Sequence, residues 1–62
     1  PLTGKQLKKL LEEHGWCLDR ISGSHHIMVR EGHRSIPIPI HGPTDLPKGL
    51  VHAILKQANI KE

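Results

Sequence analysis

The chain has almost no aromatic residues: Trp16 is the only one among 62 residues, and phenylalanine and tyrosine are absent. A domain of this size buries only about 60% of the surface that its unfolded chain exposes. The core must therefore consist of a few aliphatic side chains between one sheet and one or two helices. This composition excludes a large enclosed cofactor pocket and favours an open site, which suits a long or polymeric substrate.

The chain also lacks a second cysteine and a long apolar run. Cys17 has no partner for an intrachain disulfide, so nothing indicates an oxidising compartment, and we interpret it as a packing residue of a strand. No apolar run approaches the length of about 18 residues that a membrane span needs, and no signal peptide is recognisable. These absences predict a cytoplasmic protein with no membrane partner.

Metal and phosphate-loop motifs are missing as well. His25 and His26 are adjacent, so in a strand they point to opposite faces, and no other cysteine or histidine pair completes a tetrahedral set. The sequence therefore predicts no metal and no other cofactor. Nine Lys and Arg residues against six Asp and Glu residues give a net charge of +3. That charge permits an RNA or DNA partner without requiring one.

Two segments have the pattern of amphipathic helices. Thr3 and Gln6 form a capping-box pattern, and apolar residues then recur at helical spacing, which predicts a first helix over about residues 4–14 with Gly15 as its stop. A second helix is expected to begin near Pro47, with Asp45 as a nearby cap or first-turn anion. Its apolar stripe is expected on Leu50, Ala53, Ile54 and Ala58, widened by Leu46, Val51, Leu55 and Ile60.

Three strand-like runs lie between these helices. Simple alternation in residues 16–21 predicts one face with Trp16, Leu18 and Arg20, and another with Cys17, Asp19 and Ile21. In residues 25–30, alternation predicts one face with His25, Ile27 and Val29, and another with His26, Met28 and Arg30. Residues 31–33 are expected to form a short hairpin turn.

The third run, residues 34–40, alternates isoleucine with Pro37 and Pro39. Alternate residues direct their N–H groups to the same side, so the prolines remove donors from one edge only, which predicts an edge strand. The chain is thus predicted to be one α+β domain over residues 1–62. Its order is α-β-β-β-α, with a three-stranded antiparallel sheet and both helices on one face.

The tetrapeptide Gly23-Ser24-His25-His26 is the best candidate for chemistry. It stands between the first two strands. Histidine gives or takes a proton near neutral pH, since its free side chain has a pKa of about 6.5. Gly23 permits backbone conformations closed to other residues and leaves room for a ligand beside the imidazole.

With its neighbours, this motif resembles the HicA-type toxins of HicAB toxin–antitoxin systems, also called the YcfA-like family. The resemblance covers nearly the whole chain and is carried by Gly23-Ser24-His25 and by residues 10–16, 36–42, 46–49 and 54–60. It implies a fold like that of a double-stranded-RNA-binding domain. It also implies an mRNA interferase neutralised by a HicB-type antitoxin. The family's catalytic histidine matches His25, and His26 is the alternative, because some members place the histidine one position later.

These residue types fit a metal-free endoribonuclease. RNA carries its own nucleophile, the 2′-OH, and a histidine can remove its proton or protonate the leaving 5′ oxygen. A cation near the phosphate would stabilise the transition state. Gly23 and Ser24 are expected to support the site or contact RNA, single-stranded or structured. The candidate cations, which spacing does not rank, are Lys5, Arg20, Arg30, Arg34 and Lys48.

Two other functions compete with this one. A non-catalytic binding module of the double-stranded-RNA type would be expected to have a dense lysine cluster at the start of the second helix, where only Lys48 lies. An inactive partner in a complex is compatible with a toxin, because an antitoxin that covers the His25 surface would hold the chain in that state.

Overall fold

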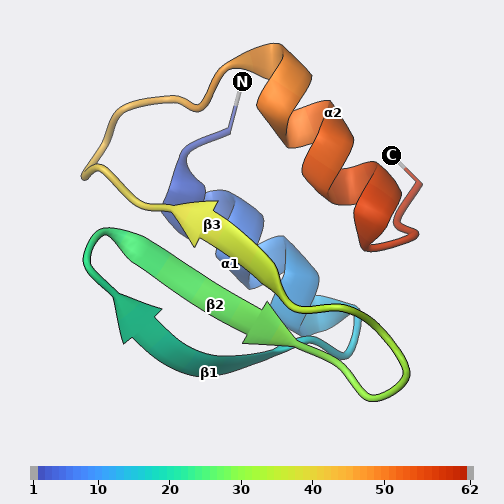
Figure 1. The fold of residues 1–62 in the computed structure, drawn as a ribbon. Helices are drawn as coiled ribbons and strands as arrows, with labels where there is room; N and C mark the ends of the chain where they lie inside the picture. Colours follow the sequence, from blue (N-terminus) through green and yellow to red (C-terminus); the bar gives the residue numbers. More distant parts are fainter. Residues whose placement is uncertain (1, 62) are drawn as a thin grey trace.

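The computed structural model describes residues 2–61. Its elements are α1 (Gly4–Glu13), β1 (Cys17–Ser22), β2 (His25–Val29), β3 (Ile36–Pro39) and α2 (Lys48–Gln57) (Figure 1). The strands form one antiparallel sheet in the order β1-β2-β3, so β2 is central. The predicted α+β architecture is confirmed, although β1 is shifted by one residue and β2 and β3 are one or two residues shorter at some ends than predicted.

Both helices lie on the same side of the sheet (Figure 1). We call this side the helix face and the opposite side the outer face. Met28, Ile36 and Ile38 point to the helix face and are at most 2% exposed. Trp16 is also 2% exposed and belongs to the same core, so it packs inside the protein and offers no platform on which a base could stack. The core is completed by Leu7, Leu11, Leu46, Ile54, Leu55, Ala58 and Ile60.

The start of α1 is the capping box expected from the sequence. The N–H of Gln6 donates to the Thr3 hydroxyl oxygen at 3.2 Å, and the N–H of Thr3 donates to Gln6 Oε1 at 2.9 Å. These bonds satisfy N–H groups that have no partner within the helix. Gly15 follows the helix with φ +90°, a conformation that glycine adopts readily, and the chain then turns into β1.

The predicted apolar stripe of α2 is rotated in the structure. Leu50 is 37% exposed and Ala53 is also exposed. The side facing the core follows the spacing i, i+3, i+4 and i+7 and consists of Val51, Ile54, Leu55 and Ala58. The helix begins at Lys48 with Pro47 as its N-cap residue, and no side chain caps it, so the predicted capping role of Asp45 is not seen.

A bulge in β1 overturns the predicted alternation of that strand. Leu18 pairs with Met28, whereas Arg20 pairs with the next residue of β2, Ile27, and Asp19 is the extra residue. In a bulge, two residues oppose one, so every later side chain moves to the other face relative to simple alternation. Arg20 therefore lies on the outer face, and Ile21 joins Leu18 on the helix face.

The free edge of β3 is blocked as predicted. The register pairs Ile38 with His26, and the N–H of Ile40 donates to the Ser24 carbonyl at 2.8 Å. Neighbouring residues direct their N–H groups to opposite sides of a strand, so Pro37 and Pro39 face the free edge. That edge lacks donors at both positions, which protects it from pairing with another strand.

Candidate functional site

The site is organised around the tight turn that joins β1 to β2. Ser22 pairs with His25, so the turn contains only Gly23 and Ser24. Gly23 has φ +60°, which favours glycine, and no atom lies within 4 Å of the position that its Cβ would occupy. The space beside the turn is therefore open. The bond from Ile40 to the Ser24 carbonyl fixes the turn to the end of β3.

The two adjacent histidines have different surroundings. His25 is exposed on the outer face, where its neighbours across the strands are Ser22 and Pro39. His26 is half-buried on the helix face between Ile21 and Ile38, and its Nδ1 atom is buried without a hydrogen-bond partner. A ligand on the outer face can reach the imidazole of His25, whereas the ring of His26 is partly enclosed by the protein.

Of the five candidate cations, Arg20 alone shares the outer face with His25. Residues that pair across antiparallel strands point to the same face of the sheet, so Arg20 shares a face with its partner Ile27. Ile27 follows His25 by two residues in β2 and therefore points to the same face as His25. Arg20 and His25 are diagonal neighbours, a relation that places residues about 7–8 Å apart, within reach of a long side chain. The guanidinium is exposed, and its Nη1 donates to Asp19 Oδ2 at 2.6 Å.

The other two arginines lie towards the opposite end of β2. Arg30 is five positions beyond His25, roughly 17 Å along a strand, and its guanidinium lies over Gly15, where a Cβ would be 3.4 Å from Arg30 Nε. Arg34 belongs to the connection before β3 and lines a hollow with Gln57 of α2. Neither is brought to His25.

The two candidate lysines lie on the elements that cover the helix face. Lys5 is in the first turn of α1, and Lys48 is the first residue of α2; both are exposed. The sheet separates them from the outer face that carries His25. Among residues 2–61, no three His, Cys, Asp or Glu side chains lie close enough together to form a metal site. In the same range, neither helix is long and apolar enough to cross a membrane.

Sequence reasoning missed Asp19, the bulge residue that holds the Arg20 guanidinium. The sequence indicates the bulge only weakly, because the charged residues Asp19 and Arg20 inside a strand-like run are compatible with either a regular edge strand or a bulge. The apolar floor of the outer face was also missed. Ile27 is 9% exposed, although no helix covers it. Its pairing partner in β3 is Pro37.

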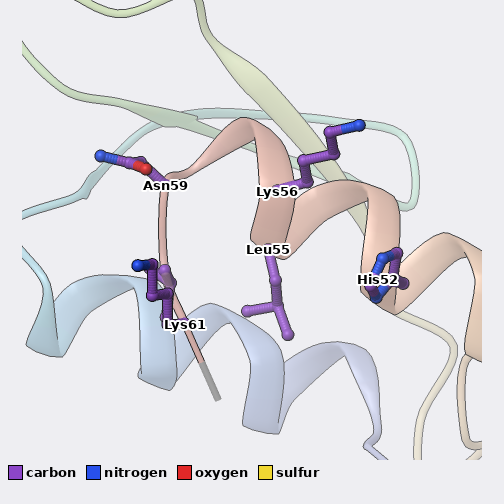
Figure 2. Close-up of a pocket in the computed structure, with 6 residues that line it drawn as sticks. His52, Leu55, Lys56, Asn59 and Lys61 are labelled. Carbon is purple, nitrogen blue, oxygen red and sulfur yellow. The ribbon is translucent and has the colours of Figure 1, made fainter.

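A groove on the other side of the molecule follows α2 and has a volume of about 390 Å³. Figure 2 shows Leu55 directed towards α1 and Lys56 directed away from it. The groove is lined by His52, Leu55, Lys56, Asn59, Ile60 and Lys61. It contains no carboxylate, hydroxyl or thiol and none of the candidate residues from the sequence, so the turn at His25 remains the candidate site.

Comparisons with known proteins agree with this fold. A family profile described as "HicA toxin of bacterial toxin-antitoxin" matches residues 4–60. A solved structure described as "Toxin-Antitoxin complex from Streptococcus pneumoniae" contains a chain that is 43% identical. The match covers 97% of this chain and 100% of that chain, with a TM-score of 0.84. A search of curated proteins found no match.

The α-β-β-β-α fold therefore has the architecture of a toxin from a toxin–antitoxin system. The chain belongs to the HicA toxin family. The family resemblance read from the sequence is confirmed.

Proposed function

We propose that this chain is an mRNA interferase: an endoribonuclease that cuts mRNA in the cytoplasm, inhibits translation and growth under stress, and is neutralised by a HicB-type antitoxin. The observation that carries the proposal is the exposed imidazole of His25 beside an open turn on the uncovered face of the sheet, in a chain of the HicA toxin family. An open surface of this kind suits a polymer.

The proposed reaction uses the nucleophile that RNA carries. The 2′ oxygen attacks the adjacent phosphorus, the bond from phosphorus to the 5′ oxygen breaks, and the products are a 2′,3′-cyclic phosphate and a 5′-hydroxyl. The proton of the 2′-OH must leave, and a proton must reach the 5′ oxygen. His25 takes the first proton as neutral imidazole or gives the second as imidazolium, and solvent water accepts or supplies the other. Either role contributes about 100- to 10,000-fold. This route needs no metal ion.

Burial supports His25 over His26 in this role. Proton transfer requires a side chain within hydrogen-bond reach of the reacting oxygen. His25 is exposed, whereas His26 is half-buried between two isoleucines. Replacing His26 is therefore expected to affect packing more than chemistry.

The test compares the wild type with His25→Ala and His26→Ala on a defined mRNA in EDTA, with circular dichroism as the folding control. We expect the wild type and His26→Ala to cut and His25→Ala to lose at least 100-fold in rate while still folded. The new 3′ ends should carry a cyclic phosphate. A 5′-phosphate product would exclude the 2′-OH route. If all three proteins bind RNA and none cuts it, the chain is a non-catalytic binding module.

The proposed antitoxin blocks the His25 surface. The similar structure from Streptococcus pneumoniae is described as a toxin–antitoxin complex, and a small open site is easily covered by a partner. Modification by diethyl pyrocarbonate tests the proposal, with exposed His52 on α2 as the internal reference. In a complex with a neutralising HicB-type protein, His25 should be protected and His52 should not. Equal modification of both would exclude steric blocking.

A further inference from the structure

The outer face around His25 forms a continuous strip across all three strands. Its side chains follow from the register, because residues opposite each other share a face. One row contains Ser22, His25 and Pro39, and the next contains Arg20, Ile27 and Pro37. The strip therefore has an apolar floor, with a histidine and an arginine on adjacent rows.

The bulge in β1 is what brings Arg20 to this strip. Without the shift between Leu18 and Arg20, alternation would direct the guanidinium to the other face. The ion pair with Asp19 at 2.6 Å uses one of the five N–H donors of the guanidinium. The remaining donors are available, and because both partners are solvent-exposed, the pair is weak enough to rearrange around a ligand.

A guanidinium recognises phosphate through two parallel N–H donors, and it keeps its charge at every pH at which a histidine titrates. A phosphate between Arg20 and His25 would therefore have a fixed positive charge on one side and a proton donor or acceptor on the other. Those are the two requirements of phosphoryl cleavage by the 2′-OH: proton transfer and stabilisation of the charge that develops on the phosphate oxygens.

The reaction also constrains the RNA. Attack requires the 2′ oxygen, the phosphorus and the leaving 5′ oxygen to be in line, a near-attack geometry that the stacked nucleotides of an A-form helix do not reach. An unpaired strand can rotate into it, because its nucleotides are not held in a helical stack, and its bases and riboses are then free to contact the protein surface. Exposed Pro37 and half-buried Pro39 are available for that contact.

We propose that the substrate is an unpaired RNA strand that crosses the outer face of the sheet, with the scissile phosphate bound between His25 and Arg20. This inference rests on the proposed ribonuclease function and deepens it by naming the substrate class and the cation. RNA binding is thereby assigned to the sheet surface and not to the helices that carry Lys5 and Lys48.

The first test compares Arg20→Ala with Arg34→Ala, which removes the same charge from the connection between β2 and β3. The substrate is one RNA oligonucleotide, supplied alone or annealed to its complement. We expect Arg20→Ala to lower kcat about 100-fold and Arg34→Ala to change it less than threefold. The annealed RNA should be cut at least tenfold more slowly. Equal losses in the two variants, or equal cleavage of the two substrates, would overturn the inference.

A phosphorothioate at the scissile position separates a phosphate contact from a structural role. Replacing the contacted oxygen by sulfur should slow the wild type and have little further effect on Arg20→Ala. The thio effect should be retained in Arg34→Ala. An unchanged thio effect in Arg20→Ala would show that Arg20 does not touch the phosphate.

A binding experiment distinguishes failure of this inference from failure of the ribonuclease proposal. A 2′-O-methyl version of the oligonucleotide cannot be cut, and its binding is followed by amide chemical shifts. We expect shifts at Ser22, His25 and Ile27 and none at Lys48. These shifts without cleavage of natural RNA would support the proposed binding surface and refute the ribonuclease proposal. Shifts confined to the helices would refute the proposed binding surface.

Discussion

Adding one methyl group at Gly4 should destabilise the protein, because α1 begins in direct contact with the backbone of β3. A Cβ on Gly4 would lie 2.2 Å from the Pro39 carbonyl oxygen and 3.0 Å from Ile40 Cα. Real Cβ atoms do not approach another atom more closely than about 3.0 Å, so the helix or the strand must move by about 0.8 Å. Both neighbours are backbone, which cannot rotate away.

The magnitude follows from two opposing effects. Overpacking of a tight contact destabilises a protein by about 1–3 kcal/mol. The higher helix propensity of alanine relative to glycine stabilises it by at most about 1 kcal/mol. We expect Gly4→Ala to lose roughly 1–2 kcal/mol of unfolding free energy. In a domain of this size, that corresponds to a fall in Tm of roughly 4–16 °C. Thermal and urea unfolding, followed by circular dichroism and Trp16 fluorescence, measure it.

Gly49→Ala is the matched control. Gly49 is also near the start of a helix, and no atom lies within 4 Å of its Cβ position. The same methyl group should therefore raise the stability by up to about 1 kcal/mol. If the two variants change stability in the same direction, the close approach of α1 to β3 is refuted. Pro39 pairs with His25, so cleavage by Gly4→Ala should also fall more than its folded fraction.

Three further changes test the core, a cap and the sheet edge. Met28→Ala removes a fully buried side chain and should cost about 2–5 kcal/mol in urea unfolding, which an exposed position would not show. Thr3→Ala breaks the reciprocal bonds with Gln6 and should cost about 1 kcal/mol in the same assay; no loss would mean that the capping box contributes nothing. The double change of Pro37 and Pro39 to valine restores two N–H donors on the free edge and should promote self-association in light scattering, whereas a monomer would show that the prolines do not protect that edge.

Local signals in the sequence were enough to identify most of the fold. Thr3 and Gln6 marked the start of α1, Gly15 marked its end, and Pro37 and Pro39 identified an edge strand; the structure contains all of these features. Each acts through the backbone within a few residues, by supplying or removing a hydrogen bond or by permitting a positive φ. Such effects depend little on the remainder of the chain.

The candidate site was only partly accessible to the same reasoning. The period of a regular strand correctly separated His25 from His26, because β2 contains no irregularity. The same rule failed in β1, since the bulge at Asp19 depends on how that strand pairs with its neighbour. The error placed Arg20 on the wrong face and Ile21 away from Leu18.

The sequence by itself determined the order of the elements, their main boundaries and the family, because local hydrogen bonding, φ preferences and a motif of fixed spacing are written in consecutive residues. Only the tertiary structure decided that Arg20 shares a face with His25, that His26 is partly enclosed, and that Gly4 lies against Pro39. These relations join residues of different elements. They arise from strand register and from the close packing of a helix on a sheet, which no single segment specifies.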